Sequence, residues 1–292
     1  MTDTIAFVGL GAMGLPMAEN LVKKQYRVVG FDMRAEAMAK LAAAGGHSAA
    51  SAREAANGAG TLILMVVNAD QAESVLFANG ALEALAPDAT VVVMATCAPG
   101  RVAEMARRVE ATGRSFVDAP VSGGVVGATG GTLTIMAAAA KPVFEKAKPM
   151  LETMGTRLYF MGETVGQGAA MKTVNQLLCG LHIAVAAEGM ALAERSGIDP
   201  NVALEILSGS AATSWMLQNR GKRMIADDGE VSSALDIFIK DLGIVLDAGR
   251  NAKIGLPLAA AAHQLYIAAS AGGLGSRDDS QVIEFYRAFR QK

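Results

Sequence analysis

The chain is poor in charged, aromatic and sulfhydryl side chains for its length. Of its 292 residues, 18% are charged and 5% aromatic, and 26 Lys+Arg stand against 28 Asp+Glu, a formal net charge of −2. Proteins average about 25% charged residues, so we expect a small solvated surface, with much of the chain buried and part of it between subunits. A nearly neutral chain also lacks the basic surface that nucleic acid or an anionic membrane selects, and we expect neither partner.

Cysteine and histidine are too few for a disulfide framework or a zinc site. Cys97 and Cys179 form no Cys-x-x-Cys pair, and the three histidines are scattered. We therefore expect no metal ion and a reducing cytoplasm. No basic segment precedes the first apolar stretch, so no signal peptide is expected. The apolar tracts at 61–67 and 177–193 are too short for a bilayer or are interrupted by His182 and Glu188, which predicts a soluble protein.

Short apolar runs alternate with alanine-rich stretches in the first half of the chain. Strands are expected at 4–10, 26–32, 61–67, 90–96 and 114–121, and helices between them at 12–24, 34–44, 70–85 and 101–112. A glycine-rich turn, a strand at 132–138, a helix from about Pro142 and a strand at 157–161 follow. Uniformly apolar strands separated by helices are typical of a parallel sheet covered on both faces. We predict an α/β Rossmann domain, doubly wound and mainly parallel.

Helical periodicity replaces this alternation in the second half. Helices are expected at about 168–196, 200–208, 215–226, 235–252, 258–271 and 280–290, with no convincing strand. The sequence therefore predicts a Rossmann domain at 1–163 and an all-α domain at 164–292, which a long helix begins.

A glycine motif lies directly after the first expected strand. Gly9-Leu10-Gly11-Ala12-Met13-Gly14 is a GxGxxG, whose glycines allow a tight turn, close approach of a pyrophosphate, and close packing of helix on strand. A bare glycine-rich turn is the alternative. Asp32, which ends the second strand, favours a dinucleotide, because an acidic residue there accepts hydrogen bonds from the ribose hydroxyls and repels a 2′-phosphate. We predict NAD over NADP, although Arg34 nearby keeps NADP open.

A second glycine pair follows the strand that contains Asp118. Ser122-Gly123-Gly124 lies where open parallel sheets bind ligands, and its hydroxyl and backbone N–H groups can hold a carboxylate. A simple turn is the alternative.

Isolated polar residues occur on two apolar helices. Lys172 and Asn175 are three residues apart and so share one helix face. Partial burial of the amine would lower its pKa toward working pH, as a general base requires; a lysine extending to solvent at a helix end is the alternative. Lys240 and Asp241 form a second pair of polar residues on an apolar helix. A surface ion pair is the alternative interpretation of these two residues.

Four of these segments, in this order and at these separations, resemble the signature motifs of the β-hydroxyacid dehydrogenase family. They are residues 9–14, 118–124, 168–175 and 240–243. The resemblance covers essentially the whole chain. It implies an N-terminal NAD-binding Rossmann domain and a long helix that leads into an all-helical domain. In this family the helical domain builds much of the subunit interface, so a homodimer or homotetramer is implied, with the active site between the domains.

The resemblance also implies a role for each matching residue. Lys172 resembles the general acid/base that acts on the substrate hydroxyl, and Asn175 the residue that orients the substrate. Ser122, Gly123 and Gly124 match the loop that receives the substrate carboxylate. Contacts to the cofactor are implied for Lys240, Val67, Asn68 and Thr96. Many members have Ser/Thr pairs where this chain has Thr96-Cys97, and we interpret Cys97 as a packing residue.

Within the family, several segments resemble the branch that acts on L-threonate. These are residues 64–71, 175–178 with 180–183, 214–216 and 278–280. The implied reaction is NAD-dependent oxidation of L-threonate to 2-dehydro-L-erythronate. 3-Hydroxyisobutyrate dehydrogenase and tartronate semialdehyde reductase share the general motifs and stay open as alternatives. Lys172 and Asp32 argue against two other readings, a nucleotide-binding module without chemistry and an imine or succinate-semialdehyde reductase.

Overall fold

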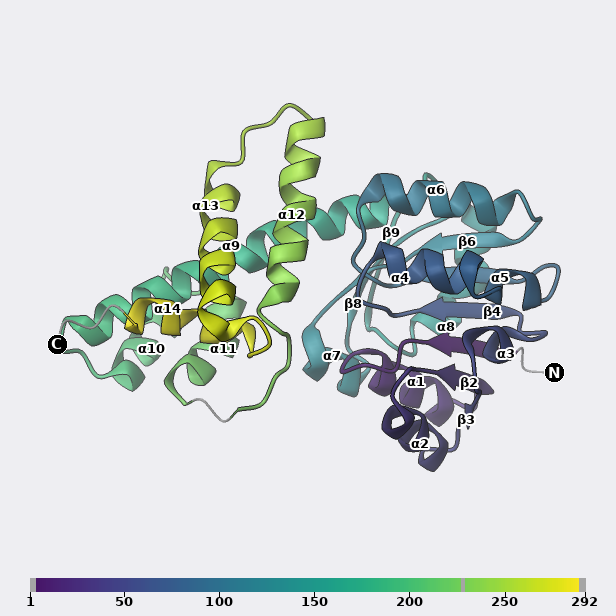
Figure 1. Ribbon diagram of the computed structural model, residues 1–292, viewed down its shortest axis with the longest axis horizontal. Helices are drawn as coiled ribbons and strands as arrows, with labels where there is room; N and C mark the ends of the chain where they lie inside the picture. The colour runs from purple at the N-terminus through teal and green to yellow at the C-terminus, as the bar shows by residue number, and fades with distance from the viewer. Residues whose placement is uncertain (1–3, 227–228, 289–292) are drawn as a thin grey trace. The chain divides into compact units, whose positions relative to one another are not determined.

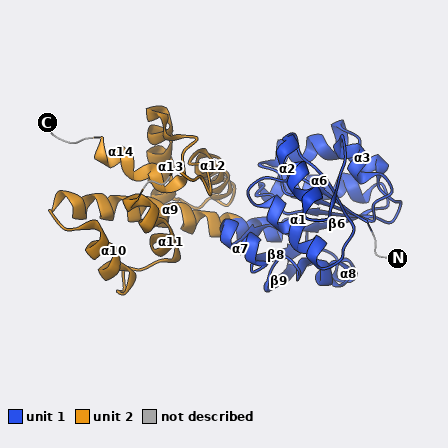
Figure 2. Ribbon diagram, turned by 90° about the horizontal axis from the view of Figure 1, so that it is seen from below, with its two compact units in different colours: residues 1–172 blue, residues 173–292 orange. Residues whose placement is uncertain are grey.

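Two compact units make up the chain, residues Met1–Lys172 and Thr173–Lys292 (Figure 2). The structure is a computed structural model that describes residues 4–226 and 229–288. The division falls inside a long helix, α9 (Gln167–Arg195). The domain boundary expected at residue 163 lies just before this helix and stays a prediction.

A mainly parallel sheet forms the centre of unit 1 (Figure 1). Its first six strands run parallel in the order β3-β2-β1-β4-β5-β6, which is the doubly wound Rossmann order. β8 pairs antiparallel with β6 and β7, and β9 pairs parallel with β8. The predicted fold class is therefore confirmed. The strands are β1 (Ile5–Val8), β2 (Val28–Phe31), β3 (His47–Ser48), β4 (Thr61–Leu64), β5 (Thr90–Val93), β6 (Ser115–Asp118), β7 (Val121–Ser122), β8 (Thr134–Ala138) and β9 (Arg157–Gly162).

Helices cover both faces of this sheet because successive strand residues point to opposite sides. In β1, Ala6 and Val8 pack into one apolar cluster, and Ile5 and Phe7 into the other. The first cluster includes residues of α3 (Ala52–Ala56), α4 (Ala69–Glu73), α5 (Ala81–Ala84) and α6 (Pro99–Glu110). The second includes residues of α1 (Gly14–Lys23), α2 (Ala35–Ala43), α7 (Gly124–Gly130) and α8 (Lys141–Leu151).

The sequence-based assignments were wrong in three short segments of unit 1. The single helix expected at 70–85 is instead α4, which continues into a π-helical turn at Ser74–Ala78, and a separate α5, which begins after Gly80 adopts φ +67°. The segment expected to be a glycine-rich turn forms helix α7 instead. Packing on α1 stabilises this helix, and the Asn20 side chain donates to the Ala128 carbonyl at 2.7 Å. The short elements β3 and α3 carried too little periodicity to be predicted.

Among the described residues of unit 2, helices joined by loops make up the secondary structure, apart from one isolated bridge between Ala234 and Asp278. It contains the rest of α9 together with α10 (Pro200–Ser208), α11 (Trp215–Ile225), α12 (Asp236–Asn251), α13 (Pro257–Ala269) and α14 (Ile283–Arg287). The last helix was expected at 280–290, but it begins as a 3₁₀ turn at Asp279–Val282, and residues 289 and 290 lie outside the described residues.

Helix α9 is long and apolar enough to cross a membrane by length and composition alone. Half of its most apolar window is buried within the structure. Ile183, Ala187 and Met190 belong to the core of unit 2, where they pack with residues of α11, α12 and α13. These properties are those of a helix in the core of a folded domain.

Candidate active site

The glycine motif forms the turn between β1 and α1. Gly9 has φ +96°, and a Cβ on it would lie 2.4 Å from the Met65 carbonyl oxygen. A Cβ on Gly14 would lie 1.8 Å from the Gly9 carbonyl oxygen, so only glycine allows α1 to start this close to the strand. A Cβ on Gly11 would have Arg34 Nη2 as its nearest neighbour, 3.8 Å away. The backbone is thus tight where helix meets strand and open at the position where a pyrophosphate approaches.

Asp32, directly after β2, is tied to this loop. Its Oδ2 accepts the Leu10 N–H at 2.7 Å, and its Oδ1 accepts the Arg34 N–H at 2.9 Å and Nε at 3.1 Å. Arg34 Nη2 in turn donates to the Leu10 carbonyl at 2.9 Å. Partial burial raises the pKa of Asp32, but the hydrogen bonds from Arg34 and Leu10 outweigh it and leave the pKa below its usual value. The carboxylate is therefore ionised at neutral pH. Leu10 contributes through its backbone, because its side chain is buried in the core.

The segment after β4 is held by Gln71, a residue that the sequence analysis did not single out. Asn68 caps α4 by accepting the Gln71 N–H at 2.9 Å, and the Gln71 side chain accepts the Val67 N–H at 2.9 Å. This reciprocal pair resembles a capping box. Val67 is left exposed at the surface, whereas the Asn68 side-chain oxygen is already engaged. Thr96 follows β5 and is half-buried, and the adjacent Cys97 lies in the core, in keeping with a packing role.

Asp118 ends β6, four residues before Ser122, and is almost completely buried. Its Oδ2 accepts the N–H groups of Gly166 at 3.0 Å and Ala169 at 2.9 Å. Burial raises the pKa of Asp118 to about 6, against the opposing effect of these backbone hydrogen bonds and one from Gly168. In the sequence, Asp118 stood out only as part of a motif. Ser122 closes β7, and Gly123 and Gly124 lead into α7.

Lys172 lies in the first turns of α9 and is 7% exposed. Charged lysines are almost never this buried unless they have a partner or a function. The alternative of a lysine extending to solvent is therefore wrong. The unit-1 positions of the candidate site thus comprise the glycine loop, Asp32, the ends of β4 and β5, the loop at 122–124 and Lys172. The strand-end positions share one edge of the sheet, because the carboxyl ends of parallel strands lie together.

Asn175 and Lys240, both in unit 2, are joined by a chain of hydrogen bonds. Asn175 Nδ2 donates to Gln176 Oε1 at 3.0 Å, and Gln176 Nε2 donates to Asp241 Oδ2. Lys240 Nζ donates to the other oxygen of Asp241 at 2.5 Å. Asp241 and Gln176 are buried, whereas Lys240 is half-buried, so the Lys240–Asp241 pair is not the surface ion pair that the sequence left as an alternative. Gln176 is a further polar residue that periodicity alone did not reveal.

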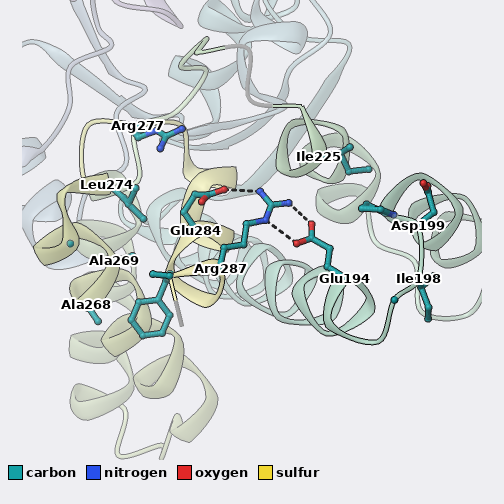
Figure 3. A pocket seen from close by; sticks show the side chains of 15 residues that line it. Glu194, Ile198, Asp199, Ile225, Ala268, Ala269, Leu274, Arg277, Glu284 and Arg287 are labelled. Carbon is teal, nitrogen blue, oxygen red and sulfur yellow. Dashed lines mark hydrogen bonds and ion pairs between the residues drawn. The ribbon is translucent and has the colours of Figure 1, made fainter. Parts of the chain in front are cut away.

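A separate pocket in unit 2 contains none of the predicted site residues (Figure 3). Its charged side chains largely satisfy one another: Arg287 donates to Glu194, to Glu284 and to the Met224 carbonyl. This arrangement stabilises the packing of α14 on α9.

A strand, glycine loop and helix followed by an acidic residue at the end of the second strand define unit 1 as a dinucleotide-binding domain. Family models match both halves of the chain: residues 4–162 match the NAD binding domain of 6-phosphogluconate dehydrogenase, and residues 166–286 match the NAD-binding domain of NADP-dependent 3-hydroxyisobutyrate dehydrogenase.

Relatives match the chain over nearly its full length. It is 42% identical to an L-threonate dehydrogenase of Cupriavidus necator, over 98% of this chain and 97% of that protein. Among solved structures, 3-hydroxyisobutyrate dehydrogenase from Salmonella typhimurium has TM-score 0.93 and 38% identity, over 97% of this chain and 99% of that one. The Mycobacterium tuberculosis 3-hydroxyisobutyrate dehydrogenase, solved with L-serine, has TM-score 0.85 and 30% identity, over 98% and 100% of the two chains.

The chain belongs to the 3-hydroxyisobutyrate dehydrogenase family, and it is an NAD-dependent hydroxyacid dehydrogenase. This confirms the predicted family, enzyme class and cofactor.

Proposed function

We propose that the enzyme oxidises L-threonate to 2-dehydro-L-erythronate, with NAD as hydride acceptor and Lys172 as general acid/base. The observation that carries the acid/base assignment is that Lys172, near the start of the mainly apolar helix α9, is buried. Burial favours the neutral form of an amine, which is the form that removes a proton. General acid–base catalysis of this kind contributes roughly 10²- to 10⁴-fold in rate.

The glycine loop fits a dinucleotide. At the start of α1, the pyrophosphate meets the backbone of Gly9, Gly11, Ala12, Met13 and Gly14. The N–H group of Leu10 in the same loop donates to Asp32. Asp32 is the acceptor for the adenosine ribose hydroxyls, and its negative charge disfavours a 2′-phosphate. Family resemblance assigns Val67, Asn68 and Thr96 to the ribose and nicotinamide half of the cofactor. It assigns Lys240 to the cofactor and the reacting centre. When bound, NAD supplies the acceptor for a hydride.

In this mechanism the substrate carboxylate binds to Ser122 and the N–H groups of Gly123 and Gly124. Asn175 orients the substrate. The Nζ of Lys172 takes the proton of the substrate's hydroxyl group, and the carbon that bears this hydroxyl gives up a hydride. In the reverse direction the same ammonium group returns the proton to the carbonyl oxygen. Lys240 Nζ donates to the Asp241 carboxylate, which balances the charge of the Lys240 ammonium group.

The L-threonate assignment is supported by relatives that carry this name at 37–42% identity, among them the proteins of Cupriavidus necator and Pectobacterium atrosepticum. 3-Hydroxyisobutyrate is the second candidate, favoured by the names of the two solved structures. Tartronate semialdehyde, reduced in the opposite direction, is the third.

A substrate panel tests the assignment. Formation of NADH is followed by its near-ultraviolet absorbance with L-threonate, D-threonate, D-erythronate, glycerate and 3-hydroxyisobutyrate, and tartronate semialdehyde is assayed in reverse. The proposal expects kcat/KM to be highest for L-threonate by at least about 10-fold, since one extra or missing polar contact in a site changes discrimination by this much or more. A higher value for 3-hydroxyisobutyrate would transfer the assignment to that substrate.

The same proposal includes a homodimer or homotetramer in the cytoplasm. One face of α9 in unit 2 leaves Val174, Leu178, Val185 and Leu192 between 49% and 67% exposed. Their spacing of 4, 7 and 7 residues places them along one stripe of the helix. An apolar stripe of this length is typical of a helix that packs on another subunit. Cys97 and Cys179 are not linked in a disulfide, which fits a reducing compartment.

A further inference from the structure

The first turn of α9 is held in place by one buried carboxylate. A helix begins with backbone N–H groups that have no partner within the helix. At the start of α9, the N–H groups of Gly166, the residue before the helix, and of Ala169 donate to Asp118 Oδ2 at 3.0 and 2.9 Å. Burial and the backbone N–H groups of Gly166, Gly168 and Ala169 are the influences that set the pKa of this carboxyl group. The carboxylate therefore serves the helix terminus.

The backbone is shaped to bring the helix this close. A Cβ on Gly168 would lie 2.4 Å from the Met136 carbonyl oxygen in β8 and 3.0 Å from both the carbonyl oxygen and Oδ2 of Asp118. Gly166, at φ +102°, would bring a Cβ within 3.2 Å of the Pro99 carbonyl oxygen at the start of α6. The start of α9 is thus packed against the middle of β8, the end of β6 and the start of α6, and at Gly168 the distances leave no room for a side chain.

We propose that Asp118 is a positioning residue, whose hydrogen bonds to the first turn of α9 set where the Lys172 amine lies relative to the substrate loop at 122–124. Asp118 is the last residue of β6, and it precedes Ser122, the first residue of that loop, by four positions. Lys172 lies three residues past Ala169, about 4.5 Å along the helix axis. One side chain therefore connects the group that receives the substrate with the group that moves its proton. This inference rests on the proposed role of Lys172.

Two substitutions at Asp118 separate hydrogen bonding from charge. Asp118→Ala removes the acceptor and leaves the N–H groups of the first turn without it, whereas Asp118→Asn keeps an acceptor oxygen and removes the charge. With L-threonate and saturating NAD, we expect Asp118→Ala to lower kcat about 10-fold or more, because a displacement of about 1 Å costs up to roughly 100-fold in rate. Asp118→Asn should restore kcat to within about 3-fold of the wild type. The affinity for NADH should stay within about 2-fold in both variants, since the glycine loop is untouched.

Amide hydrogen exchange provides a readout that does not depend on the substrate. The peptide that covers residues 164–172 should exchange faster in Asp118→Ala than in the wild type or in Asp118→Asn. Asp199→Ala is the matched control, because the Asp199 carboxylate also accepts two N–H groups at a helix start, those of Asn201 and Val202 in α10. This variant should lose a helix cap yet keep kcat within about 2-fold.

If Asp118→Ala does not fold, Gly168→Ala tests the same contact, since its methyl group forces the turn away from Met136 and Asp118 while every polar group remains. It should lower kcat in the same way. The inference is overturned if Asp118→Ala, or Gly168→Ala in its place, keeps kcat within about 2-fold of the wild type. It is also overturned if Asp118→Asn loses as much activity as Asp118→Ala while amide exchange at 164–172 in Asp118→Asn matches that of the wild type. Lys172→Ala, assayed alongside, distinguishes the two failures: turnover retained in that variant would refute the proposed function, whatever the exchange shows.

Discussion

The buried carboxylate of Asp118 should make the protein less stable as the pH rises through the acidic range. Burial lifts its pKa in the folded protein to about 6, from the 3.8 of an aspartate in an unfolded chain. Between these two values the unfolded chain releases the proton and the folded chain keeps it, so the unfolded state binds fewer protons and stability falls with increasing pH. At about 1.36 kcal/mol per pKa unit, the penalty approaches about 3 kcal/mol above pH 7.

Asp118→Asn removes this titration and keeps one acceptor oxygen for the backbone N–H groups. The variant should therefore be more stable than the wild type, by about 1 kcal/mol at pH 4.5 and about 3 kcal/mol at pH 8. Urea unfolding followed by circular dichroism at several pH values from 4.5 to 8 measures both curves. The difference between them isolates Asp118 from the other carboxylates, whose contributions are common to both proteins. A difference that stays constant across this range, or one that shrinks as the pH rises, would refute the reasoning.

Two further variants test the cofactor and subunit assignments. Asp32→Ala should lower kcat/KM for NAD about 10-fold and that for NADP much less, because only the NAD ribose loses a charged acceptor; initial rates with both cofactors measure this, and an unchanged NAD/NADP ratio would contradict the ribose role. Leu192→Glu places a charge on the exposed stripe of α9 and should shift the protein toward monomer, since burying one leucine is worth about 2 kcal/mol and a buried carboxylate is costly. Light scattering checks the mass, and a wild-type protein that is already monomeric would remove the basis for a subunit interface.

Most of the fold could be predicted from the sequence because its signals are local. Apolar runs such as Val91–Val93 specify buried parallel strands, and the glycine motif specifies the first turn. The second half could be assigned to helices for the same reason, since its apolar residues recur with helical period. One of the wrong assignments was decided by packing between distant segments. Helix α7 is rich in glycine and forms because it packs on α1, which no local pattern reveals.

The candidate site shows the same division. Lys172, Asp32 and Ser122 were identified from residue type and spacing, together with a family resemblance. The role of Asp118 depends on residues about 50 positions further along the chain, which a linear pattern does not bring together. Gln176 and Asp241 likewise contact each other from two different helices. Buried polar side chains on apolar elements are the signal that could have pointed to them, because such groups need partners.

Lys172→Ala tests the central claim most directly. With saturating NAD and L-threonate, kcat should fall by at least about 10²-fold across pH 6 to 10, because no other group is assigned to take the hydroxyl proton. The affinity for NADH, measured by fluorescence titration, should remain within about 3-fold of the wild type, since the glycine loop and Asp32 are unchanged. A variant that turns over at close to the wild-type rate would contradict the account.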